Sequence, residues 1–187
     1  MKFFLLSPAY DKDGDTIFRS VGVIPKDSKK LVAWHGRHQQ GRQEAKNSFE
    51  HLRYHWRDPK IKIIADYPSG SSGDVFSSKA ITILHEMLEA NGDIHPLVFE
   101  EIDVSYSLFD CWSFVGAKTN EDYNWFRDGS LKTLTVENSE DLPDVFVVKK
   151  PKTIPGLIVS ERFKTAAEQA GLTGMVFTEI EIIQESK

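Results

Sequence analysis

The most regular pattern of apolar and polar residues lies near the C-terminus. The apolar triplet Leu157-Ile158-Val159 leads into Ser160, and the next ten residues carry apolar side chains at helical spacing, namely Phe163, Ala166, Ala167 and Ala170. A serine hydroxyl accepts a hydrogen bond from a free amide at the start of a helix. Gly171 adopts positive φ without strain and suits the end of one. The pattern therefore predicts a helix between Ser160 and Gly171.

The residues after this helix alternate with a period of two from Met175 onward. Such alternation predicts a strand with two different faces. Val176, Thr178, Ile180 and Ile182 share one face, and Phe177, Glu179 and Glu181 share the other. We expect the apolar side of the helix, formed by Phe163, Ala166, Ala167 and Ala170, to pack on the sheet that contains Val176, Ile180 and Ile182.

A similar unit occurs earlier in the chain. Ser77 follows Val75-Phe76, an amphipathic helix comes next, and Gly92 is placed to stop it. The strand that follows, with Leu97 matched to Met175, repeats Val, Phe, Glu and Ile at the same four places. We infer an internal strand-helix-strand repeat.

Other segments complete the prediction of fold. Alternation and apolar runs predict strands at residues 2–7, 17–23, 61–65, 108–115, 131–136 and 145–148, and a helical stripe predicts a helix at residues 42–56. Short turns separate most strands, so the expected fold class is α+β, with a mainly antiparallel sheet and about three helices. The length of 187 residues suits one domain spanning residues 1–187.

Composition narrows the classes of function. The net charge of -5 disfavours a general nucleic-acid binder and would match a basic protein partner. Apolar runs fall short of the ~20 residues of a membrane span, and the short N-terminal run does not fit a secretory signal. The lone Cys111 cannot form an internal disulfide. From these features together we expect a cytoplasmic protein without membrane contact.

Three segments carry a family resemblance. Residues 157–164 read hydrophobic-V-S-E-R-hydrophobic-K, residues 171–177 contain G-x-x-G followed by Phe177, and Asp144-Val145-Phe146 lies upstream. This pattern resembles the C-terminal signature of bacterial immunity proteins from polymorphic toxin systems. The resemblance implies an antitoxin-like protein that binds a cognate toxin domain in the producing cell and blocks it by occlusion. It implies no catalytic residue and no cofactor.

Two groups of residues suit such binding. Carboxylates on strand faces would match a basic toxin surface, and rings mixed with charges have the composition of interface anchors. The candidate partner-binding residues are Glu101, Asp103, Tyr123, Trp125, Phe126, Glu179 and Glu181. The alternative for the aromatic residues is a loop that packs its rings on its own sheet.

Catalytic patterns are few. No G-x-S-x-G, H-E-x-x-H or Rossmann glycine pattern occurs, and Cys111 suits a buried, inert thiol better than a nucleophile. The alternative function is a small metal-dependent or hydrolytic enzyme that uses a histidine cluster, His35, His38, His51 and His55. Basic side chains surround these histidines and disfavour a cation. We therefore expect no metal site.

Overall fold

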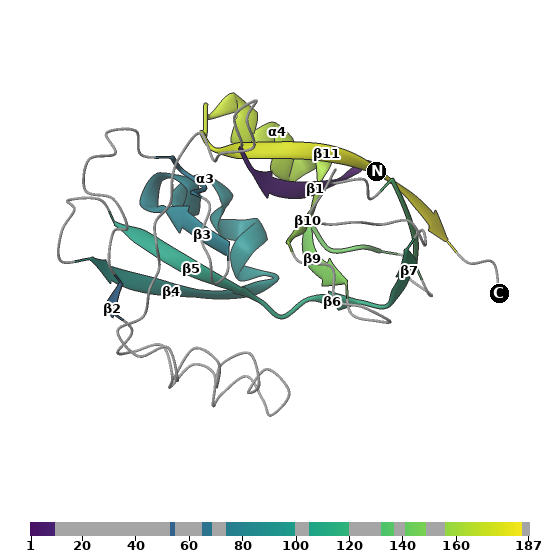
Figure 1. Cartoon of the computed structure of the whole chain (residues 1–187), viewed down its shortest axis with the longest axis horizontal. Coiled ribbons are helices and arrows are strands. Elements are labelled where there is room, and N and C mark those ends of the chain that lie inside the picture. The colour runs from purple at the N-terminus through teal and green to yellow at the C-terminus, as the bar shows by residue number, and fades with distance from the viewer. Residues whose placement is uncertain are drawn as a thin grey trace.

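The computed structural model describes residues 1–9, 53–54, 65–68, 74–99, 105–119, 132–136, 141–148 and 156–184 (Figure 1). Within these residues the fold is α+β, as predicted. Two helices lie in this part of the chain, α3 (Ser78–Glu89) and α4 (Glu161–Gln169), against an expectation of about three for the whole. Neither is long and apolar enough to cross a membrane.

One sheet has four strands in the order β2-β4-β5-β3. They are β2 (Arg53–Tyr54), β3 (Asp74–Ser77), β4 (Gly92–Phe99) and β5 (Tyr106–Cys111). β5 lies between β3 and β4 and is antiparallel to both, whereas β2 runs parallel to the end of β4. α3 directly follows β3.

The other sheet has seven strands in the order β6-β9-β10-β1-β11-β8-β7. They are β1 (Phe3–Pro8), β6 (Phe114–Val115), β7 (Ala117–Thr119), β8 (Thr133–Val136), β9 (Val145–Val148), β10 (Ile158–Ser160) and β11 (Met175–Gln184). The two edge strands, β6 and β7, are separated in sequence by Gly116 alone. The sheet must therefore curl until its edges meet, as Figure 1 shows.

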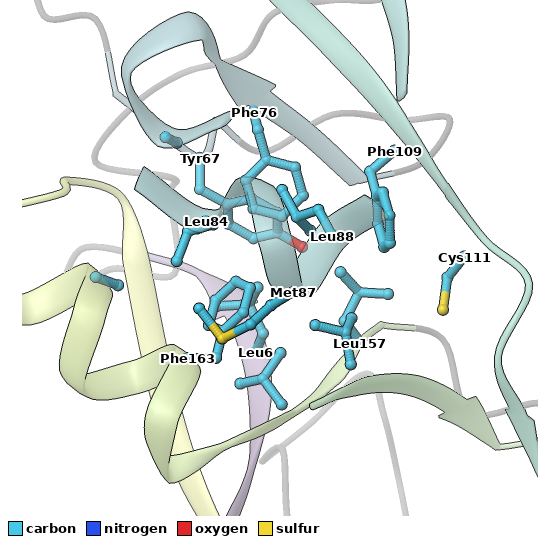
Figure 2. Close-up of a cluster of buried hydrophobic side chains, with 14 of the residues drawn as sticks. Leu6, Tyr67, Phe76, Leu84, Met87, Leu88, Phe109, Cys111, Leu157 and Phe163 are labelled. Atoms are coloured by element: carbon cyan, nitrogen blue, oxygen red, sulfur yellow. The ribbon is translucent and has the colours of Figure 1, made fainter. Parts of the chain in front are cut away.

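β1 separates two hydrophobic cores because its side chains alternate. Phe4 and Leu6 enter a core shared by both sheets and both helices, drawn in Figure 2, whereas Phe3 and Leu5 enter a second core inside the curled sheet. The shared core includes Phe76, Leu84, Met87, Leu88, Phe109, Val159, Phe163 and Ala167. Each of these side chains is at most 5% exposed. This core fixes the two sheets against each other.

The predicted repeat recurs in three dimensions, with a different strand alignment. In both units a strand ends in a serine that caps the following helix, and the next strand returns beside an antiparallel partner. Ser160, Met175 and Ile180 lie 83 positions after Ser77, Gly92 and Leu97, and each pair occupies the same place in its sheet. The sequence alignment of Leu97 with Met175 was wrong, because Leu97 is opposite Tyr106 as Ile180 is opposite Phe3.

The equivalence extends to four strands and a helix. The α3 layer (β2, β3, α3, β4, β5) and the α4 layer (β8, β10, α4, β11, β1) have matching orders, β2-β4-β5-β3 and β8-β11-β1-β10. Even the parallel pairs correspond, since β2 pairs with β4 from Val98 and β8 pairs with β11 from Glu181, again 83 positions apart. The central strand is β5 in one layer and β1 in the other.

Helix α4 forms as predicted and packs on the sheet that contains β11, but it covers the strand face opposite the predicted Val176, Ile180 and Ile182. Phe163 and Ala167 are fully buried, and the Phe163 and Phe177 rings meet edge to face with centroids 6.5 Å apart. Ile180 instead enters the second core. The helix thus covers the Phe177 face of β11. Gly171, at φ 60°, ends α4 while the Leu172 amide donates to the Ala167 carbonyl.

Two predictions of local structure were wrong. Arg53–Tyr54 is strand β2 and not the end of a helix, because its backbone pairs with β4; the rest of residues 42–56 lies outside the described part. Gly92 does not end α3, which stops at Glu89, but opens β4. A Cβ on Gly92 would lie 2.1 Å from the Phe109 ring, so glycine is needed there for close approach.

The remaining strand predictions agree more closely with the structure. The strand at residues 145–148 is confirmed, and the strands predicted at 2–7 and 131–136 appear as β1 and β8 with shifted ends. The stretch predicted at residues 108–115 is two strands, because it is interrupted at Trp112 and Ser113, whose amides donate to the Asn91 carbonyl. The strand at residues 17–23 and most of that at 61–65 lie outside the described residues.

Candidate interaction site

The described residues hold two of the predicted partner-binding side chains, Glu179 and Glu181. Both lie on β11. The other candidates lie outside the described residues: Glu101, Asp103, Tyr123, Trp125, Phe126 and the four histidines His35, His38, His51 and His55. In the part of the chain that the structure describes, no group of three His, Cys, Asp or Glu residues is placed to hold a metal ion.

The outward face of β11 changes character along its length. Phe177 is partly buried under α4, but Glu179, Glu181 and Ile183 on the same face are all exposed. The Ile183 side chain is 44% exposed, in the part of β11 that extends beyond β1 and pairs with β8 alone. On β8, Thr133 and Thr135 occupy the paired positions beside Glu181 and Ile183. An open face of mixed carboxylate and aliphatic character therefore continues beyond the helix.

Two further charges adjoin this face. Lys2 Nζ contacts Glu179 Oε1 at 2.9 Å, and the hydrogen bond and charge of Glu179, together with the charge of Glu161, raise the pKa of Lys2. The first residue of α4, Glu161, is anchored by its amide, which donates to the Lys2 carbonyl at 2.9 Å. We call the set Lys2, Glu161, Glu179, Glu181 and Ile183 the β11 face. Its three carboxylates exceed its one lysine.

The α3 layer shows that the fold does not need these charges. Its Ser78 amide donates to the Ser105 carbonyl at 3.0 Å, just as the Glu161 amide donates to the Lys2 carbonyl at 2.9 Å. On β4, Pro96 holds the place that Glu179 holds on β11, and Val98 holds the place of Glu181. The same backbone frame is therefore built with neutral residues, and the carboxylates of the β11 face are additions to it.

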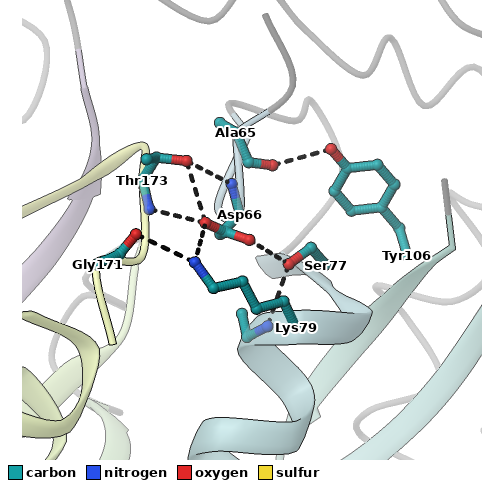
Figure 3. Close-up of polar contacts among 8 residues, drawn as sticks. Ala65, Asp66, Ser77, Lys79, Tyr106, Gly171 and Thr173 are labelled. Carbon is teal, nitrogen blue, oxygen red and sulfur yellow. Dashed lines mark hydrogen bonds and ion pairs between the residues drawn. The ribbon is translucent and has the colours of Figure 1, made fainter. Parts of the chain in front are cut away.

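Two other clusters, each made of a serine, an aspartate and a basic residue, stabilise the starts of the two helices. In the Asp66 cluster, Ser77 Oγ donates to Asp66 Oδ1 at 2.6 Å and accepts from the Ala80 amide at 3.1 Å (Figure 3). Asp66 Oδ2 accepts from the Thr173 amide at 2.9 Å, and Lys79 Nζ donates to the Gly171 carbonyl at 3.2 Å. These bonds tie the start of α3 to the turn after α4.

The Asp144 cluster repeats this arrangement at the start of α4. Ser160 Oγ donates to Asp144 Oδ1 and accepts from the Phe163 amide at 3.2 Å. Arg162 bridges Asp144 Oδ2 at 3.0 Å and Glu86 Oε2 on α3 at 2.9 Å. Both serines are occupied as helix caps, so neither is arranged as a nucleophile. Arg162 at the start of α4 contacts Glu86 near the end of α3, and Lys79 at the start of α3 contacts Gly171 just after α4, so the two helices run antiparallel.

The buried Cys111 thiol lacks the properties of a reactive nucleophile. Burial raises the pKa of the Cys111 thiol to about 12, so the thiol stays protonated at neutral pH. Burial likewise raises the pKa of Asp74 to about 6, opposed by the hydrogen bond that Tyr67 Oη donates to it. The sequence-based interpretation of Cys111 as a buried residue is confirmed.

No protein-family model matches the chain, and no curated protein matches it. The candidate site therefore rests on the residues themselves. Of the β11 face, the sequence analysis missed Lys2, Glu161 and Ile183. The alternation at β11 already placed Ile183 beside Glu181, whereas the proximity of Lys2 to Glu161 and Glu179 depends on the pairing of β1 with β10 and β11.

Proposed function

We propose that this chain is an immunity protein that binds a basic bacterial toxin domain in the producing cell and blocks it by occlusion. The observation that carries the proposal is the β11 face, where Glu179 and Glu181 stay exposed on a strand that pairs first with β1 and then with β8. The neutral residues at equivalent places of the α3 layer support a role outside folding. The resemblance of residues 157–177 to immunity proteins supplies the kind of partner.

The proposed mechanism needs no bond to be made or broken. Carboxylates attract a basic partner over a range of about 8 Å at physiological ionic strength, which raises the association rate more than the final affinity. Ile183 would then lose its contact with water under the partner, and burial of apolar area stabilises the complex. Charge sets how fast the complex forms, and apolar contact sets how long it lasts.

The charge test compares two matched variants. The Glu179→Gln/Glu181→Gln variant should associate several-fold more slowly than the parent with the toxin domain encoded beside this gene. The Glu89→Gln/Asp141→Asn variant removes the same charge from exposed positions off the β11 face and should retain most of the parent rate. Stopped-flow rates at rising salt should converge for all three proteins. Equal rates for both variants at low salt would contradict the assignment of this face.

A second test addresses the aromatic anchors predicted from the sequence. Trp125→Ala should speed dissociation of the complex, because truncating a buried interface anchor costs roughly 2 kcal/mol or more, which raises the dissociation constant about thirtyfold or more. Surface plasmon resonance separates the two rate constants. If the parent neither binds the toxin domain nor protects cells that express it, immunity itself is refuted.

A further inference from the structure

We infer that the chain is an internal duplication in which the second copy is permuted, so that the N-terminal strand β1 completes the C-terminal unit. This inference concerns how the molecule is built and does not depend on the proposed function. Its basis is the match between the α3 layer and the α4 layer, which covers four strands and one helix in each.

The match is detailed at the serine caps. The Ser77 amide donates to the Asp66 carbonyl at 2.8 Å, and the Ser160 amide donates to the Asp144 carbonyl at 2.8 Å. Each aspartate also accepts from the serine hydroxyl, and each lies near the basic residue two positions beyond the serine, Lys79 or Arg162. An amphipathic helix beside a strand does not require this set of polar contacts, so chance similarity is a poor explanation.

Side-chain packing agrees with the polar contacts. Helix positions Ala80 and Leu84 correspond to Phe163 and Ala167, and all four lie in the core shared by the sheets. The strand before each helix contributes Phe76 in the α3 layer and Val159 in the α4 layer. The central strand contributes Phe109 in the α3 layer and Leu6 in the α4 layer. The two copies therefore face each other across one core, with their helices antiparallel.

The connections explain the permutation. In the α3 layer, β4 runs on to the central strand β5, and eight residues separate the paired Leu97 and Tyr106. In the α4 layer the corresponding pair is Ile180 and Phe3, which belong to β11 and β1, the last and first strands among the described residues. Residues 181–187 and 1–2 make nine residues, which would span the same gap if the ends were joined.

β1 thus occupies the place that β5 holds in the first copy. Because β1 and β11 are antiparallel neighbours, the end of β11 and the start of β1 lie at the same end of the sheet. If Lys187 were bonded directly to Met1, the connection from β11 to β1 would be one residue longer than the connection from β4 to β5. Loop closure depends only weakly on such a difference in length.

Circular permutation tests this construction with the full set of residues. Lys187 is joined directly to Met1, and new ends are opened between Asn138 and Ser139 in one protein and between Gly70 and Ser71 in another. Both openings fall in turn-forming sequence between strands. At least one permutant should unfold cooperatively with a melting temperature within about 5 °C of the parent. Failure of both to fold would overturn the inference.

A graft distinguishes duplication from mere proximity of the ends. In the folded permutant, residues 98–105 replace residues 181–187 and 1–2, so that Phe99 takes the place of Ile182 in the second core. A control carries the same eight residues in an order that puts a polar residue there. The grafted protein should melt several degrees higher than the control. A control that melts at the same or a higher temperature would overturn the duplication.

Discussion

The α3 layer and the α4 layer use the same backbone frame for different surfaces. Both place a capping serine, an antiparallel central strand and a parallel outer strand at equivalent positions. Where the α3 layer has Ser78, Pro96 and Ser105, the α4 layer has Glu161, Glu179 and Lys2. The frame is therefore maintained by caps, pairing and core contacts, while the charged side chains beside the helix start are free to serve recognition.

The layers also differ in what covers their second face. In the α4 layer, β9, β6 and β7 extend the sheet until it curls around Phe3, Leu5 and Ile180. This enclosure gives β1 a core on each side. The outward face of β11 beyond α4 remains open as a result, because the added strands lengthen the sheet without covering that face.

The largest expected effect comes from breaking the shared core in the α4 layer. Phe163→Ala removes a fully buried ring and should lower the free energy of unfolding by about 3 to 5 kcal/mol, or the melting temperature by about 10 °C. Thermal unfolding followed by circular dichroism measures this. Ile83→Ala, at a 43% exposed position on α3, is the control and should change little. An unchanged melting temperature for Phe163→Ala would contradict the packing of α4.

Removing the two serine caps tests whether they contribute equally to the free energy of unfolding. Ser77→Ala and Ser160→Ala should each cost about 1 to 2 kcal/mol, since each loses an acceptor for a helix amide and a donor to an aspartate. Chemical denaturation gives both values. Costs that differ by more than about 2 kcal/mol would show that only one of the clusters stabilises its helix.

Asp74, in the α3 layer, should make the stability of the protein depend on pH between about 4 and 6. Its folded-state pKa of about 6 lies above the ordinary 3.8, so stability should be complete below pH 4 and fall as the pH rises to about 6. Asp74→Asn should remove this fall and raise the melting temperature by a few degrees at pH 7 but not at pH 4. Asp141→Asn, at an exposed position, is the control. A gain that is equal at both pH values would contradict the buried charge.

The smallest expected effect is on the stability of the proposed binding variant. Glu179→Gln/Glu181→Gln should change the free energy of unfolding by less than about 0.5 kcal/mol, because exposed ion pairs such as Lys2–Glu179 contribute little. Differential scanning calorimetry of the free protein measures this. A loss above about 1 kcal/mol would mean that these carboxylates belong to the frame, against the comparison with Pro96 and Val98.

The sequence by itself determined the elements whose signals are local. Capping by Ser160, the positive φ of Gly171 and the alternation after Met175 each depend on residues within a few positions, so the α4 unit was predictable. The α+β class followed from the same signals. The resemblance to immunity proteins also depends on local sequence, and it stays a prediction.

Tertiary structure decided whatever depends on pairing between distant segments. Gly92 looked like a helix stop, but its role depends on Phe109 in the neighbouring strand. Leu97 seemed to match Met175, but strand register makes it the equivalent of Ile180. The place of β1 between β10 and β11 brings Lys2 to Glu179. A local pattern specifies a strand and its two faces, whereas the partner of each face depends on which distant strands pair and in which register.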